Sequence, residues 1–117
     1  MSSTATVINV SVKHIRPAYA NLADWCSDPR HVYIGRAGVV FIEGQRYPKQ
    51  PSPFANPFKI GRDGSREEVL EKYEALMRQR LAATPYLLRG LEGKTLGCWC
   101  KPAACHGEVL IKLMLES

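Results

Sequence analysis

The chain has 117 residues, a formal net charge of +5 and an average composition, with 45% hydrophobic and 23% charged residues. This length fits one domain, and the composition argues against a disordered chain, a collagen or a coiled coil. No apolar run approaches the ~18–20 residues that span a bilayer, and the N-terminus lacks the features of a signal peptide. We therefore expect a cytoplasmic protein, in the host cytoplasm if the source is viral, with no membrane partner. The basic balance favours polyanionic or phosphorylated partners, although a solvated surface explains it equally well.

The first part of the chain predicts short strands and one short helix. After a flexible tail at 1–6, alternating apolar and polar residues predict a half-buried strand over 7–13. Near-helical apolar spacing predicts a helix within 18–30 that ends before a proline. The β-rich runs at 31–35 and 39–42 flank glycines and predict a hairpin or a bent strand.

The middle of the chain combines a long loop with the clearest helix. Residues 43–64 hold four prolines and three glycines, which predicts an irregular loop of a length that is often functional. Ser65 and Glu68 fit a capping box, so we predict a helix over 66–82. Its apolar stripe is expected to belong to the core and not to a cofactor site.

The remaining elements complete the fold class. A second short helix is expected over 85–91, a strand over 94–100 and a closing, well-buried helix over 105–115. The sum is an α/β fold, a small mixed sheet flanked by helices, in a single domain over 7–117.

Three of the four cysteines fall within eight residues, beside a histidine, where the last strand meets the last helix: Cys98, Cys100, Cys105 and His106. In an extended segment, Cys98 and Cys100 point to one face and Trp99 to the other. In a reducing compartment such a cluster indicates metal binding or thiol chemistry before disulfides. Cys26 lies far away in sequence and is expected in the core.

Three interpretations of this cluster remain open. The four side chains could form a Cys₃His zinc site, although the C-x-C-x₄-C-H spacing differs from the usual C-x₂-C pairs. Alternatively, Cys105 is a nucleophile or orienting group and His106 an acid/base, since a helix N-terminus stabilises a thiolate. In the third, the thiols pack the core and His106 caps the helix.

Other polar residues are candidates for ligand binding. Gly35 allows close backbone approach, and Arg36 after it can fork onto a phosphate. Asn56 could read a base or ribose, or hold its own loop. Arg66 occupies a helical first turn that usually prefers an acid, and Lys101 adjoins the cysteines. A lone arginine such as Arg36 is more often an ordinary surface residue, Arg66 could face a carboxylate in place of a ligand, and Lys101 could equally be solvated. The chain contains no P-loop, no G-x-G-x-x-G and no H-E-x-x-H.

Four blocks of sequence then indicate a family: V-Y-I-G-R at 32–36, A-N-P-F at 55–58, G-R-D-G-S-R-E-E-V-L-E-K-Y at 61–73 and L-E-G-K-T-L-G-C-W-C-K-P-A-A-C-H-G-E-V-L at 91–110. Over about 7–115 the chain resembles the family called domain of unknown function 4326, from bacteria, phages and large DNA viruses. The resemblance brings no activity, substrate or cofactor with it. It implies that the following residues belong to the family pattern: Gly35, Arg36, Asn56, Pro57, Phe58, Arg66, Cys98, Cys100, Cys105, His106 and Gly107.

Two hypotheses follow. In the first, the cations, Asn56 and the cluster form one site that binds a phosphate-bearing ligand such as a nucleotide or nucleotide derivative, with or without a transferase or hydrolase step on it. The 43–64 loop would close over this ligand. In the second, the protein is a zinc-stabilised module that binds nucleic acid or a host factor without catalysis.

Overall fold

The computed structural model describes residues 5–99 and 105–116. Within these ranges the elements are, in chain order, β1 (Thr6–Asn9), α1 (Val12–Ile15), α2 (Leu22–Cys26), β2 (His31–Tyr33), β3 (Val40–Ile42), β4 (Gln45–Tyr47), α3 (Arg66–Ala83), the 3₁₀ helix η1 (Arg89–Leu91), β5 (Thr95–Cys98) and α4 (His106–Glu116). No helix within the described ranges is long and apolar enough to cross a membrane.

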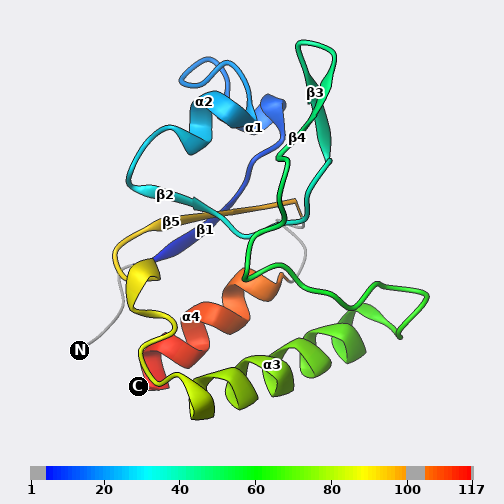
Figure 1. Cartoon of the computed structure of the whole chain (residues 1–117), viewed down its shortest axis with the longest axis vertical. Helices are drawn as coiled ribbons and strands as arrows, with labels where there is room; N and C mark the ends of the chain where they lie inside the picture. Colours follow the sequence, from blue (N-terminus) through cyan, green and yellow to red (C-terminus); the bar gives the residue numbers. More distant parts are fainter. Residues whose placement is uncertain (1–4, 100–104, 117) are drawn as a thin grey trace.

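The centre of the fold is a three-stranded parallel sheet in the order β1-β5-β2. Helices α1 and α2 cover one face of this sheet, and α3 and α4 cover the other (Figure 1). Strands β3 and β4 form a separate antiparallel hairpin, which stands away from α3 and α4. The expected α/β fold in one domain is therefore confirmed, and its mixture of strand directions comes from two separate sheets.

Side-chain alternation along the strands divides the core into two clusters. Val7, Val32 and Leu96 face α3 and α4, whereas Ile8 and Tyr33 face α1 and α2. This period of two is what a pleated strand imposes. Because both of its faces are covered, β5 is buried along most of its length, as parallel strands usually are.

The same alternation separates Cys98 from Trp99, as the sequence predicted. Cys98 is buried in the cluster under α3 and α4, and Trp99 packs on the other face. The glycine before Cys98 leaves room for a large ring on that other face. A Cβ added to Gly97 would lie 2.6 Å from a ring carbon of Trp25.

The capping box predicted for α3 is present. Ser65 Oγ accepts from the Glu68 amide at 3.2 Å, and Glu68 Oε1 accepts from the Ser65 amide at 2.9 Å. The helix runs one residue beyond the predicted end, and it stops where Pro85 disfavours helical geometry in Thr84. Val69, Tyr73 and Met77 are buried, so this face of α3 forms core as expected.

Three local predictions were wrong. The first strand ends at Asn9, whose side-chain oxygen accepts from the Ser11 amide at 2.8 Å and turns the chain into the short α1. The body also begins earlier than residue 7, because Ala5 is buried and Thr6 already pairs with Thr95. The first correction shortens the predicted strand at its end and puts a helical turn after it, and the second moves its start forward to Thr6.

The third correction concerns the hairpin. Strand β2 does not pair with β3, because β2 pairs with β5 and β3 pairs with β4. The actual turn lies at Glu43 and Gly44, with φ of 52° and 79°. Two consecutive positive φ values are typical of the tight turns that join twisted antiparallel strands. Strand β4 also falls inside the predicted 43–64 loop, so that prediction holds only for 48–64, which is irregular. The 3₁₀ helix η1 occupies the end of the expected 85–91 helix.

Candidate functional site

A pocket of about 500 Å³ lies at the carboxyl edge of the parallel sheet. Strands β2 and β5 end there, and α3 and α4 begin there (Figure 1). In open α/β sheets, ligands bind in the crevice outside the carboxyl ends of the strands. The positive ends of helix dipoles at such an edge favour an anionic ligand group. The pocket is lined by Gly35, Arg36, Val39, Asn56, Phe58, Lys59, Ile60, Arg66, Val69, Leu70, Trp99 and His106.

The lining combines positive charge with apolar surface. Arg36, Lys59 and Arg66 are its charged residues, and no aspartate or glutamate is among the described residues that line it. The two carboxylates in the first turn of α3, on Glu67 and Glu68, are exposed and lie outside the lining. The remaining wall is mostly apolar and aromatic. Such a pocket suits a ligand with an anionic group at one end and a flat or apolar body.

Most residues proposed from the sequence come together here. Gly35, Arg36, Asn56, Arg66 and His106 all line the pocket, although they come from four separate segments of the chain. Two other predicted site residues lie elsewhere: Cys98 and Cys105 are 0% and 1% exposed and belong to the core cluster. The predictions for Cys100 and Lys101 fall outside the described residues.

Arg36 holds one wall of the pocket in place. Its Nε and Nη2 donate to the carbonyl oxygen of Asn56 at 3.3 and 3.1 Å, and Nη2 also donates to that of Phe58 at 3.1 Å. A guanidinium carries five N–H donors. Among the described residues, no partner occupies the two donors on Nη1. Arg36 therefore fastens the loop and retains two donors that a ligand can use.

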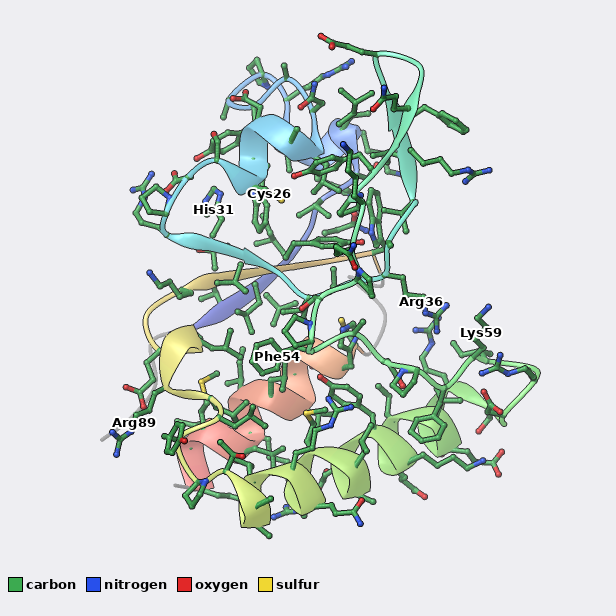
Figure 2. All side chains as sticks on the ribbon, viewed as in Figure 1. Cys26, His31, Arg36, Phe54, Lys59 and Arg89 are labelled. Carbon is green, nitrogen blue, oxygen red and sulfur yellow. The ribbon has the colours of Figure 1, made fainter. Side chains whose placement is uncertain are left out.

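Asn56 and Lys59 show how the loop is organised locally. Asn56 Oδ1 accepts from the Phe58 amide at 2.9 Å, so this side chain holds its own loop. The Lys59 amide donates to Asp63 Oδ2, and the Lys59 carbonyl oxygen accepts from the Asp63 amide. The Lys59 side chain is exposed, and its Nζ makes no hydrogen bond or ion pair within the described part of the chain. Figure 2 shows Arg36 and Lys59 on the same side of the molecule.

A chain of hydrogen bonds orients the aromatic wall. Trp99 Nε1 donates to Tyr33 Oη at 2.8 Å, and Tyr33 Oη donates to the Arg36 carbonyl at 2.9 Å. Burial raises the pKa of the Tyr33 phenol, which keeps this hydroxyl protonated as a donor. Gly35 contributes by lacking a side chain, since a Cβ there would lie 2.3 Å from Tyr33 Oη. The glycine thus admits the tyrosine ring, where the sequence suggested approach of a ligand.

The loop between β4 and α3 is fastened by side chains that donate to its carbonyls. Tyr73 Oη donates to Phe54 at 2.6 Å, and Arg80 Nη1 donates to Pro53 at 3.0 Å (Phe54 is labelled in Figure 2). Lys72 Nζ donates to Asp63 at 2.6 Å. Burial raises the pKa of Tyr73 far above its ordinary value. These hydrogen bonds therefore hold the loop in place as a wall of the pocket, and its closure over a ligand stays a prediction.

His106 links α4 to the end of β2. The residue is 8% exposed, and Nε2 lies 2.7 Å from the Ile34 carbonyl oxygen. Because a carbonyl only accepts, Nε2 carries a proton, and in the neutral ring Nδ1 presents its lone pair. Nδ1 lies 3.7 Å from Cys105 Sγ. Both ring nitrogens of His106 are thus engaged inside the protein.

Cys105 is the residue that caps α4. Its Sγ accepts from the Gly107 amide at 3.4 Å, and its own amide donates to Glu108 Oε1 at 3.2 Å. The predicted position at a helix N-terminus is therefore confirmed. The thiol is buried and lies outside the pocket lining. Catalysis by Cys105 and His106 stays a prediction.

The zinc hypothesis can be compared with the same pair of atoms. Two ligands of one tetrahedral zinc, with bonds of about 2.3 Å to sulfur and 2.0 Å to nitrogen, lie about 3.5 Å apart. The Cys105–His106 separation of 3.7 Å is close to that value. However, no three cysteine, histidine or acidic side chains among the described residues form a group that could hold a metal ion. A site with Cys98, Cys100, Cys105 and His106 thus depends on Cys100 and stays a prediction.

Some lining residues were missed by the sequence analysis: Val39, Lys59, Ile60, Val69, Leu70 and Trp99. Val69 and Leu70 were assigned to the core stripe of α3, yet its first turns also form pocket wall. Lys59 carried a usable signal, because it follows directly on the A-N-P-F block. Trp99 carried another, because a tryptophan that points away from the cysteine face at a strand end needs a second surface to contact.

Comparison with known proteins identifies relatives in viruses. The family described as Domain of unknown function (DUF4326) matches residues 18–116. The chain is 36% identical over 59 residues (47% of this chain, 55% of the relative) to the "Uncharacterized 12.4 kDa protein in nrdA-td intergenic region" of Enterobacteria phage T4. It is 37% identical over 91 residues (70% of this chain, 65% of the relative) to "Uncharacterized protein R718" of Acanthamoeba polyphaga mimivirus. The matches thus span between half and two thirds of these relatives. No solved structure matches significantly.

Proposed function

This chain belongs to the family described as Domain of unknown function (DUF4326), and we propose that it binds a phosphate-bearing nucleotide or nucleotide derivative in the pocket at the carboxyl edge of the sheet. The observation that carries the proposal is the lining itself, with three cations, no described carboxylate and an apolar, partly aromatic wall. The phosphate would form charge-assisted hydrogen bonds with the cations, and the base would pack against the flat apolar surface.

Two features of the pocket support phosphate as the anionic group: the donors of its cationic side chains and the helix N-termini beside them. The Nζ of Lys59 and the Nη1 of Arg36 offer donors at one side of the pocket. Charge-assisted hydrogen bonds to phosphate are among the stronger polar contacts in proteins. The pocket also receives the N-terminal ends of α3 and α4, which add partial positive charge.

Binding, rather than catalysis, is what this geometry supports best. Both nitrogens of His106 contact the protein, and the Cys105 thiol is 1% exposed. His106 lines the pocket, but a transferase or hydrolase step that used His106 or Cys105 would require one of them to exchange its protein contact for the ligand. The zinc-stabilised module without catalysis has less support, because the Cys105–His106 separation suits zinc but no three possible ligands among the described residues form a group.

A thermal-shift panel tests the class of ligand. We expect nucleoside phosphates at 100 times their dissociation constant to stabilise the protein by about 2.7 kcal/mol, which raises the melting temperature by about 10 °C. Inorganic phosphate contacts only the cations and the free nucleoside contacts only the apolar wall, so each should give a smaller shift in melting temperature. Equal shifts with phosphate and nucleotide would contradict a role for the apolar wall, and no shift with any nucleotide would refute the proposal.

Charge-removal variants test the location. Lys59→Gln and Arg66→Gln should each weaken nucleotide binding about 10-fold, because each removes a charged hydrogen-bond donor. Arg89→Gln is the matched control: it removes the same charge from an exposed arginine on the opposite side of the molecule (Figure 2). Calorimetric titration measures the dissociation constants. Equal losses in all three variants would mean that the net charge, and not this pocket, attracts the ligand.

A further inference from the structure

We propose that the bound nucleotide is part of a single-stranded nucleic acid, and that the next nucleotide of the strand stacks on the outer face of the β3–β4 hairpin. This inference rests on the proposed function and names the partner that the same site would take. It is carried by three observations on the hairpin: an exposed aromatic ring, an apolar surface that continues into the pocket, and an excess of positive charge.

The outer face of the hairpin presents Phe41 beneath a guanidinium. Phe41 and Arg46 are directly opposite on the ladder, and the Arg46 Cζ atom lies 4.7 Å from the ring centroid. Phe41 nevertheless remains 66% exposed. Its strand neighbour Val40 and the cross-strand Tyr47 pack inward against the α1/α2 cluster. Phe41 therefore contributes to a surface and not to the core.

This surface continues into the pocket. Val39 and Ile60 line the pocket and are also exposed, by 40% and 54%. Val39 precedes Phe41 by two residues, so at about 3.3 Å per residue their Cα atoms lie at most about 7 Å apart. Arg46 Nη1 donates to the Gly38 carbonyl at 3.0 Å, which fixes the arginine at the base of the hairpin beside the pocket. A strand that leaves the pocket over Val39 would meet Phe41 next.

The local charge suits a phosphate backbone. Residues 36–59 contain four basic residues and one acidic residue, so their formal charge of 4 − 1 = +3 accounts for most of the +5 of the whole chain. Proteins hold single strands by stacking bases on exposed aromatic rings beside cations that track the backbone. In a duplex the base faces are already stacked and cannot lie on Phe41. An acidic peptide would use the charges but would leave the ring unexplained.

Fluorescence polarisation with labelled 12-nucleotide strands tests the proposal, with DNA and RNA as separate arms and a duplex of the same sequence for comparison. The single strand should bind at least 10-fold more tightly than the mononucleotide. Phe41→Ala should weaken strand binding about 10-fold, because stacking on an aromatic side chain contributes substantially per base. The same variant should leave mononucleotide binding unchanged. Tyr86→Ala is the matched control, since Tyr86 is also 66% exposed but lies outside the pocket lining.

Several results would overturn the inference. A duplex that binds as tightly as the single strand would do so, as would polyglutamate that competes as well as the oligonucleotide. A mononucleotide that binds while the strand gains nothing over it would refute this inference and leave the proposed function intact. A mononucleotide that fails to bind at all would refute the proposed function. The two failures are therefore distinguishable in one set of titrations.

Discussion

Substitution of Gly35 by alanine should disrupt the aromatic wall of the pocket without touching a ligand. A Cβ at this position would lie 2.3 Å from Tyr33 Oη and 2.5 Å from Cζ, closer than real contacts allow. The ring cannot simply move aside, because its hydroxyl donates to the Arg36 carbonyl and accepts from Trp99 Nε1. The added methyl group must therefore shift the backbone or break both hydrogen bonds.

The size of the effect follows from these contacts. Overpacking a filled site costs about 1–3 kcal/mol, and the two hydrogen bonds of Tyr33, one part-buried and one exposed, contribute up to about 1 kcal/mol each. We expect Gly35→Ala to lower the free energy of unfolding by about 3–5 kcal/mol, or the melting temperature by roughly 10–20 °C. Gly90→Ala is the matched control, because a Cβ at Gly90 would meet nothing within 4 Å and should change stability by less than about 0.5 kcal/mol.

A double-mutant cycle isolates the clash. Tyr33→Ala removes the ring that the new methyl group would meet. In that background, Gly35→Ala should cost less than about 1 kcal/mol, which gives a coupling energy of about 2–4 kcal/mol. Urea denaturation of the wild type, the two single variants and the double variant measures the four free energies of unfolding in the cycle. If Gly35→Ala cost the same with and without the tyrosine ring, or cost nothing by itself, the explanation of this glycine would be wrong.

Two further predictions concern buried polar groups. His106→Ala should destabilise the protein by about 2–4 kcal/mol in thermal denaturation, because the Ile34 carbonyl loses its partner and the ring leaves a cavity; a variant as stable as the wild type would show that the bond is unimportant. Burial raises the pKa of Tyr73, so the folded state holds the phenolic proton more tightly than the unfolded chain, and the stability this gives is complete below pH 10.0 and lost as the pH rises further. Urea midpoints at pH 8 and pH 11 should therefore differ less in Tyr73→Phe than in the wild type, and an equal alkaline loss in both proteins would contradict this assignment.

Local signals in the sequence were sufficient for α3. Ser65 and Glu68 lie within one helical turn, so the residues that define the start of the helix are neighbours in the chain. The strand pairing was not predictable in this way. Strand β2 could be read from its residues, but its partner β5 lies some sixty residues later, and nothing between 31 and 42 indicates that pairing. The predicted hairpin was accordingly assigned to the wrong pair of strands, and the alternative of one bent strand is also wrong, because β2 and β3 belong to separate sheets.

In the candidate site, too, the sequence indicated the residue types, whereas their arrangement in space depends on contacts between distant segments. Residue types alone suggested Arg36, Asn56 and Arg66 as ligand-binding groups, but their convergence depends on the β1-β5-β2 strand order. The role of Arg36 was only partly predicted, because three of its hydrogen bonds go to the loop. Lys59 was missed because its residue type does not separate it from other exposed loop cations, and its position directly after the A-N-P-F block was the one signal that marked it.

A crystal structure of the protein with a bound nucleotide decides whether the pocket at the carboxyl edge of the sheet holds this ligand. We expect the phosphate at hydrogen-bonding distance from Lys59 Nζ and from Arg36 Nη1 or Arg66, with the base against the wall formed by Trp99 and its neighbours. A nucleotide held at another surface, or one whose phosphate faces solvent while its base fills the pocket, would contradict this expectation.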